Sequence, residues 1–239
     1  MIRRQLRAVT FDVTGTLIHA PRLGEIYAEV LRRHGMEVEP VEARRTVKLV
    51  WGEFSCACRL GEDRFSAHPE GCRGWWSSFL ERVCQHLEVG RPSPFARAEL
   101  YDRFGRAEAW EIYTEVPETL DRLRAQGLKL GVVSNWDDRL PRLLERLGLA
   151  SRFEVVVYSA EVGGEKPFPA IFRRALERLA TPPELALHVG DRREEDVEGA
   201  QAVGMPALHL DRRDGSGDLA DLRPLGEFCS AVEGWWEPG

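Results

Sequence analysis

Four polar residues lie at the ends of apolar segments and are of types that could do chemistry together. Asp12 follows LRAVTF, Ser134 follows LKLGVV, Asp191 follows LALHVG, and Lys166 opens KPFPAIF. A carboxylate can attack phosphorus only if negative charge is neutralised, which requires a hard cation, hydrogen-bond donors and an ammonium group. Each pattern is weak alone, because Asp and Gly commonly close strands into turns. Their joint meaning depends on the elements that position them.

Those elements alternate between strands and helices. Apolar runs at 6–13, 128–135, 153–159, 185–191 and 206–210 predict buried strands, and segments 117–127, 138–148, 169–180 and 197–204 predict helices between them. This alternation is typical of an α/β fold with a parallel sheet. Sites in such sheets lie at the carboxyl ends of the strands. We therefore expect Asp12, Ser134 and Asp191 to converge.

The segment from about residue 22 to 110 has a different pattern, helical and rich in Arg and aromatic residues. Breaks at GED, HPEGCRG and GRPSP separate its helices. Linkers near 18–22 and 108–116 would let such an insert close over the site. We predict three segments: the first part of the core at 1–19, a helical cap domain at 20–111, and the second part of the core at 112–239.

Composition excludes several classes of protein. The net charge is −6 and basic residues are scattered among acidic ones, so no cationic stripe for nucleic acid is expected. No run of residues is long and apolar enough to span a membrane, and the N-terminus does not resemble an export signal. Five cysteines, an odd number, favour a reducing cytoplasm over a disulfide framework. We expect a cytoplasmic monomer or homodimer.

The four polar segments together resemble the four motifs of the haloacid dehalogenase (HAD) superfamily. The segments are FDVTGTL at 11–17, VVSN at 132–135, EKPFPAIF at 165–172 and HVGDRREEDVEGAQAVGM at 188–205. The insert resembles the helical cap of subfamily I, and the GEIYAE start of the cap is similar to the HAD-like hydrolase domain-containing protein 3 group. The resemblance implies a Rossmann-like parallel sheet core with an inserted α-helical cap domain.

The resemblance also implies a mechanism. Asp12 would attack phosphorus to form an aspartyl-phosphate that water then hydrolyses, and the substrate would be a small phosphorylated molecule. Mg²⁺, which prefers oxygen ligands, would be held by Asp12, the backbone carbonyl of Thr14 and Asp191, with Asp196 supporting them. These residues predict a metal-dependent phosphatase.

Three further residues would bind the phosphoryl group. By the same resemblance, Ser134 and Asn135 would donate hydrogen bonds to its oxygens, and Lys166 would neutralise both the nucleophile and the transferring group. Only three of the 33 basic residues are lysines. Lys166 therefore stands out where a compact ammonium charge is needed.

Thr14 departs from the family pattern. Most phosphatases of the superfamily carry an aspartate two residues after the nucleophile, which protonates the leaving group and then activates water. A threonine hydroxyl has no useful pKa near neutrality, so proton transfer worth roughly 10²–10⁴-fold should be weakened. His19 is a candidate replacement, although a hinge or surface role is favoured. We expect a slow phosphatase.

Two alternatives stay open. A 2-haloacid dehalogenase would use Asp12 on carbon without a metal, and Arg22 would bind halide. Such enzymes lack the first aspartate of the fourth motif, whereas this chain retains Asp191, which favours phosphorus. A non-catalytic binding protein on the same fold is the second alternative. A phosphonatase role, which would need Lys48 as a cap Schiff base, has thin support.

Other patterns favour structural roles. Cys56, Cys58, His68 and Cys72 lack the paired spacing of common zinc sites. The cap aromatics are expected to pack against one another more than to line a pocket; they are Trp51, Phe54, Trp75, Trp76 and Phe79. The pairs Glu194-Glu195 and Asp137-Asp138 would stabilise helix starts without further function.

Overall fold

A five-stranded parallel sheet forms the centre of the larger of two units in the computed structural model, which describes residues 6–56 and 61–212. The strand order is β5-β4-β1-β6-β7. The strands are continuous apolar runs rich in Val and Leu, because helices cover both faces of the sheet and leave neither face exposed to water. The bounds are β1 Ala8–Phe11, β4 Lys129–Ser134, β5 Val155–Tyr158, β6 Ala186–Gly190 and β7 Ala207–His209.

The register of the sheet brings three strand ends together. Phe11, the last residue of β1, pairs with Val132 of β4 and Val189 of β6. The residues that follow these positions therefore lie at the same edge. Asp12 extends the pattern, since its backbone N–H donates to the carbonyl of Val189 over 2.9 Å.

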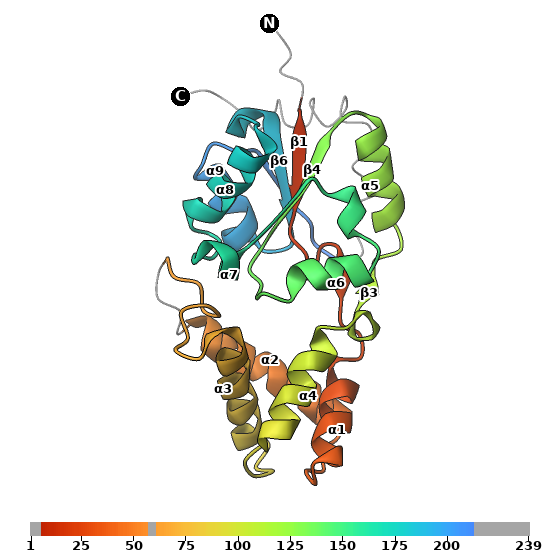
Figure 1. Cartoon of the computed structure of the whole chain (residues 1–239), viewed down its shortest axis with the longest axis vertical. Coiled ribbons are helices and arrows are strands. Elements are labelled where there is room, and N and C mark those ends of the chain that lie inside the picture. Colours follow the sequence, from red (N-terminus) through yellow and green to blue (C-terminus); the bar gives the residue numbers. More distant parts are fainter. Residues whose placement is uncertain (1–5, 57–60, 213–239) are drawn as a thin grey trace, which may run out of the picture.

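Helices on the two sides of the sheet bury separate apolar clusters. Leu120 and Leu123 of α5 and Leu143 of α6 pack with residues of β1 and β4, whereas Phe172 and Leu176 of α8 belong to a second cluster. Figure 1 shows α5 on one side of the sheet and α8 and α9 on the other. These elements are α5 Val116–Ala125, α6 Leu140–Arg146, α7 Ser159–Val162, α8 Pro169–Leu179, a π-helix at Arg193–Glu198 and α9 Gly199–Gln201.

Within the described residues, four helices form the second unit, which is the predicted helical cap. Ser93 caps the last of them by accepting a hydrogen bond from the N–H of Ala96, and proline follows at the first helical position. Trp75 and Phe79 are 6% and 1% exposed inside the cap's own apolar cluster, which confirms the predicted packing role of these two aromatics. The helices are α1 Leu23–Arg33, α2 Pro40–Cys56, α3 Gly71–His86 and α4 Pro94–Phe104.

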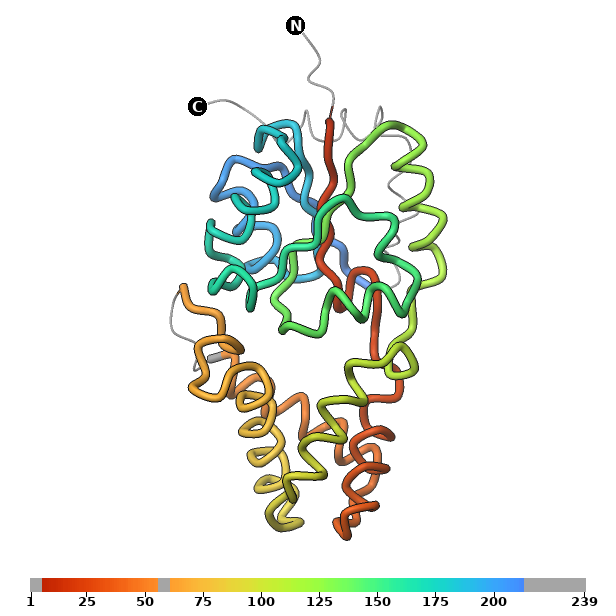
Figure 2. The backbone as a smooth tube through the Cα atoms, in the orientation of Figure 1, coloured from red at the N-terminus to blue at the C-terminus, as the bar shows by residue number. Residues whose placement is uncertain are grey.

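A short antiparallel ribbon carries the chain between the two units. Strand β2, Ile18–His19, pairs with β3, Glu111–Ile112. The two chain segments that connect the core with the cap lie side by side (Figure 2). The α/β fold with a helical cap is thus confirmed. Short 3₁₀ turns lie at Ala107–Ala109, Ala150–Arg152 and Pro183–Leu185.

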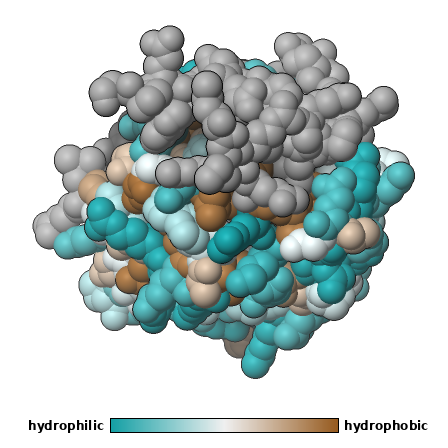
Figure 3. Space-filling view, turned by 90° about the horizontal axis from the view of Figure 1, so that it is seen from above, coloured by the Kyte–Doolittle hydropathy of each residue, from teal (hydrophilic) through white to brown (hydrophobic). Residues whose placement is uncertain are grey.

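The end of the core away from the cap is mostly hydrophilic where described residues are visible, with smaller apolar areas between them (Figure 3). Among the described helices, none has the length and apolar character needed to cross a membrane.

Candidate active site

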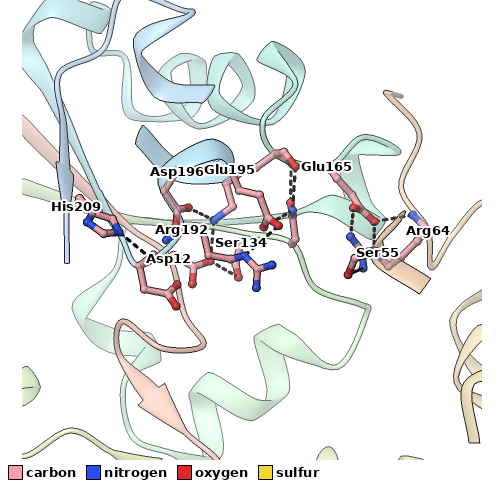
Figure 4. A network of polar contacts seen from close by, with 12 residues as sticks. Asp12, Ser55, Arg64, Ser134, Glu165, Arg192, Glu195, Asp196 and His209 are labelled. Atoms are coloured by element: carbon pink, nitrogen blue, oxygen red, sulfur yellow. Dashed lines mark hydrogen bonds and ion pairs between the residues drawn. The ribbon is translucent and has the colours of Figure 1, made fainter. Parts of the chain in front are cut away.

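Asp12 lies at the carboxyl end of β1 with 7% of its surface exposed. Its Oδ1 accepts hydrogen bonds from the Ser134 hydroxyl over 2.9 Å and from Lys166 Nζ over 2.7 Å. These donors come from residues 122 and 154 positions away (Figure 4). Neither bond engages Oδ2. The sheet therefore presents a carboxylate whose charge is partly neutralised and whose second oxygen is not used by these donors.

Lys166 is buried, with 3% exposed, and binds three acceptors. Besides Asp12, its Nζ donates to the carbonyl of Val133 over 3.0 Å and to Oδ1 of Asp196 over 2.5 Å. Burial acts to lower the pKa of Lys166, but the charges of Asp12 and Asp196 outweigh burial and raise that pKa. The ammonium group is thus charged and held in one orientation.

Asp196 supports that orientation from the opposite side. It accepts from Lys166 Nζ, from the Arg192 backbone N–H over 2.9 Å, and lies 3.1 Å from Nε2 of His188. Although burial acts to raise it, the Lys166 charge and the His188 hydrogen bond hold the pKa of Asp196 below its usual range. A Cβ on Gly190 would lie 2.1 Å from Cγ of Asp196, so glycine permits this close approach.

His188 is a buried partner of Asp196 that sequence reasoning missed. Burial lowers the pKa of His188, while the carboxylate of Asp196 opposes that shift. In the neutral ring, Nε2–H donates to Asp196 and Nδ1 accepts from the Thr10 hydroxyl, 2.9 Å away. The sequence offered one signal for this role: His188 is a polar residue inside the apolar run of a predicted strand. It orients Asp196 from within the sheet.

Asp191 is the carboxylate best suited to a cation. Among the described residues, Asp12, Asp191 and Asp196 form the group that could share a metal ion, with ligand atoms within 4.8 Å of one another. Oδ1 of Asp191 is buried and has no hydrogen-bond partner. Burial, with the charges of Asp12 and Asp196, raises the pKa of Asp191 to about 7. A hard divalent cation would relieve both the repulsion and the unsatisfied oxygen, so the residues fit Mg²⁺.

The loop after β1 wraps closely around this carboxylate. Gly15 has φ +88°, and a Cβ there would lie 2.4 Å from Oδ2 of Asp191. Any larger residue would therefore displace Asp191 as well as strain the backbone. Thr14, the preceding residue, is exposed and bridges to Ile18. Its predicted role through the backbone carbonyl stays a prediction.

Asn135 is tied to the backbone of Lys166. Its Oδ1 accepts from the Lys166 N–H over 2.6 Å, and its Nδ2 donates to the Lys166 carbonyl over 3.0 Å. The same Nδ2 reaches Oε2 of Glu195 over 3.1 Å. The amide thus positions the lysine; direct binding of a phosphoryl oxygen by Asn135 stays a prediction.

A π-helical turn, missed from the sequence, follows Asp191 and contains Asp196. The segment Arg193–Glu198 is π-helical, a conformation that adds one residue to a turn and is frequent at functional sites. Ligand atoms of both carboxylates lie within 4.8 Å of Asp12. The run of acidic residues gave no periodic signal from which this turn could be found.

The other candidates lie outside this cluster. His19, in β2, stacks on Tyr113, which follows β3, with ring centroids 4.5 Å apart. Arg22 pairs with Glu29 of the cap over 3.0 Å, and Lys48 is exposed on α2. Neither basic residue is buried beside Asp12.

The cysteines and the histidine whose spacing disfavours a zinc site cannot all be placed in the structure. Cys58 lies outside the described residues, and α2 ends at Cys56. His68 contacts the Glu70 N–H over 3.1 Å and the Ser78 hydroxyl over 3.3 Å, and Cys72 is a free thiol. Among the described residues, no cluster suited to zinc includes them.

The Asp137-Asp138 pair binds the cap, so the prediction of a helix-start role without further function is wrong. Oδ2 of Asp137 accepts from the Trp76 indole N–H over 2.6 Å, and Oδ1 of Asp138 accepts from the Tyr101 hydroxyl over 2.7 Å. Arg139 stacks over the Tyr101 ring at 3.9 Å. We call these five residues the 137–139 contact between core and cap.

Similarity to known proteins shows the family to which the chain belongs. Residues 6–204 match the model of the haloacid dehalogenase-like hydrolase family. The chain therefore belongs to the haloacid dehalogenase-like hydrolases.

Among its relatives is haloacid dehalogenase-like hydrolase domain-containing protein 3 of Mus musculus, 37% identical over 85% of this chain and 81% of that protein. Glyceraldehyde 3-phosphate phosphatase of Methanopyrus kandleri is 40% identical over 92% of this chain and 88% of the phosphatase. A magnesium-bound structure of the HAD hydrolase YfnB from Bacillus subtilis shares the fold, with a TM-score of 0.70, 15% identity, and coverage of 96% and 99% of the two chains.

Proposed function

We propose that the chain is a magnesium-dependent phosphatase that acts on a small phosphorylated molecule through an aspartyl-phosphate at Asp12. The observation that carries the proposal is the buried Oδ1 of Asp191, which lies beside Asp12 and has no hydrogen-bond partner. The charged ammonium group of Lys166 binds Asp12. An enzyme in which Asp12 attacks carbon without a metal would not need the Asp191 carboxylate. The Methanopyrus kandleri relative, named as a phosphatase, supports the same class of reaction.

The proposed reaction has two steps. An Asp12 oxygen attacks phosphorus while the bond from phosphorus to the leaving oxygen breaks; Ser134 and Lys166 stabilise the charge on the transferring group. Water then attacks the phosphorus of the aspartyl-phosphate, which releases inorganic phosphate and restores the carboxylate. Mg²⁺, held by Asp12, Asp191 and the Thr14 carbonyl, would neutralise phosphate charge.

The rate should depend strongly on the leaving group. Thr14 cannot donate a proton near neutrality, so the departing oxygen must leave as an anion or take its proton from water. Aryl and acyl phosphates have leaving groups of low pKa and should suffer least. Equal rates for alkyl and aryl phosphates would contradict this proposal about Thr14.

The test is phosphate release from p-nitrophenyl phosphate with Mg²⁺ or EDTA, by wild type and Asp12→Asn. Arg82→Ala is the matched control, since Arg82 pairs with Glu53 on the cap surface over 2.8 Å and lies outside the cluster. We expect release that needs both metal and Asp12. Release that persists in Asp12→Asn would contradict the aspartyl-phosphate.

The dehalogenase alternative is tested in parallel. It predicts chloride release from 2-chloropropionate in EDTA, which the phosphatase proposal does not. Release of neither phosphate nor chloride would favour the remaining alternative, a non-catalytic binding protein on this fold.

A further inference from the structure

The cap and the core are joined by a buried ion pair that the site described above does not use. Three donors of Arg64 reach the Glu165 carboxylate, each over 2.7 Å: the backbone N–H and Nε to Oε1, and Nη2 to Oε2. The two side chains are 8% and 7% exposed. Figure 4 shows Arg64 of the cap and Glu165 of the core meeting beside Ser55. A fork of this kind fixes both distance and orientation.

The ion pair is part of a larger contact between two backbone segments. Asp63, next to Arg64, donates its backbone N–H to the carbonyl of Gly163 over 3.1 Å. Its carboxylate in turn accepts from the N–H and hydroxyl of Ser66, each over 2.6 Å. The cap loop is thus ordered internally and lies against the core. We call the residues 63–66 and 163–165 the 64–165 contact.

Glu165 directly precedes Lys166 in the chain. The N–H and carbonyl of Lys166 are both bonded to the Asn135 amide, and its Nζ reaches Asp12. A displacement of the Glu165 backbone therefore acts on the Lys166 peptide group before it acts on any other part of the site. Displacements of about 1 Å at a reacting group can cost roughly 10²-fold in rate.

The pair can form only when the cap is docked. Arg64 belongs to the cap, between α2 and α3, and Glu165 belongs to the core, before α8. A buried charge that loses its partner must be resolvated or is strongly destabilising. Separation of the two units would therefore release Glu165 at the same moment as it admits water to the site.

We propose that Arg64 is a positioning residue: through Glu165 it aligns Lys166 with Asp12 only while the cap is docked on the core. Arg64 acts on the reaction without touching the reacting atoms. The proposal rests on the proposed phosphatase function for its rate effect, whereas the coupling of the two segments can be measured without activity.

The kinetic experiment is a double-mutant cycle with p-nitrophenyl phosphate and Mg²⁺. We expect Arg64→Ala and Glu165→Gln each to lower kcat about tenfold to hundredfold, with a much smaller change in KM. The double variant should be no slower than the slower single variant, because both remove one interaction. Arg82→Ala, which breaks an arginine–carboxylate pair within the cap, should keep the wild-type kcat. Unchanged kcat in the folded single variants, or multiplicative effects in the double variant, would overturn the proposal.

A conservative variant covers the case in which Arg64→Ala does not fold. Arg64→Lys keeps the charge but cannot make the bidentate fork, so we expect an intermediate loss of kcat. A kcat equal to wild type in this variant would mean that the geometry of the fork does not position Lys166, and would overturn the proposal.

Hydrogen exchange tests the coupling without turnover. The backbone N–H groups of Asp63, Arg64 and Lys166 are bonded in the docked state. Arg64→Ala should accelerate exchange both in the cap segment 61–67 and in the core segment 164–168, whereas Arg82→Ala should accelerate neither. Faster exchange in the cap segment alone would overturn the proposal. If wild type releases no phosphate, the proposed function fails and this exchange result alone decides the role of Arg64.

Discussion

The edge of the core that holds the candidate active site and the interior of the cap are stabilised by opposite kinds of interaction. At the core edge, Asp12, Lys166 and Asp196 form a buried network of charges. In the cap, Phe79 packs against Trp75 with centroids 5.4 Å apart and nearly parallel rings, in a cluster of aromatic and aliphatic residues.

This difference separates the roles of the two regions. A buried ion network contributes little net stability, because desolvation offsets the attraction between its charges, but it fixes where each charge lies. Apolar burial contributes stability in proportion to area and places no charge. We therefore expect substitutions at the core edge to act mainly on rate, measured on folded protein because an unpaired buried charge is also destabilising, and substitutions inside the cap to act mainly on stability.

After the loss of the nucleophile in Asp12→Asn, the largest expected effect on rate comes from Lys166→Met. Removal of the ammonium group should lower kcat about 10³-fold, because the transferring charge loses its main stabilising donor. Steady-state phosphate release at saturating Mg²⁺ measures it. Lys48→Met, at the exposed cap lysine, should retain wild-type activity. Equal losses in the two variants would contradict the separation of roles.

The largest expected effect on stability comes from Phe79→Ala. Phe79 is 1% exposed, so its truncation should lower the free energy of unfolding by about 3–5 kcal/mol. Phe95→Ala, at a ring that is 80% exposed in the same cap, should change it far less. Urea unfolding measures both. A kcat loss above tenfold in folded Phe79→Ala would break the comparison, since it would tie cap packing directly to chemistry.

Thr14→Asp sharpens the comparison by adding a charge at the core edge. An acid at this position should raise kcat for alkyl phosphates by up to about 10²-fold, and less for p-nitrophenyl phosphate. Thr14→Asn, which has a similar shape but no proton to donate, should give no increase. A gain in both variants would mean that polarity or size, rather than proton transfer, limits the rate.

The smallest expected effect lies at the 137–139 contact, where the two kinds of interaction meet. Trp76→Phe keeps an aromatic ring but removes the hydrogen bond to charged Asp137, so the free energy of unfolding should fall by about 1.5–3 kcal/mol. Trp110→Phe, whose indole N–H donates to the Phe104 carbonyl, should cost only about 0.5–1.5 kcal/mol. Thermal unfolding compares the two variants, and the shift in Tm of each is converted to a difference in the free energy of unfolding at the midpoint. A larger loss in Trp110→Phe would argue against a charged anchor at Asp137.

Residue patterns were enough to predict the α/β core, the helical insert and the convergence of Asp12, Ser134 and Asp191, which the structure shows. These features depend on local periodicity and on one geometric rule, that parallel strands end at a common edge. Lys166 was predicted differently, from the resemblance of EKPFPAIF to a motif of the HAD superfamily.

The hydrogen-bond and ion-pair partners of these residues could not be predicted and are seen only in the folded chain. Asn135 engages the Lys166 backbone, His188 orients Asp196 from inside the sheet, and Arg64 reaches Glu165 across 101 positions of sequence. Such pairs depend on how two surfaces are docked and on side-chain directions within a few ångströms, neither of which has a periodic signal in the chain. Patterning specifies which residues are buried, while docking specifies which buried charges meet.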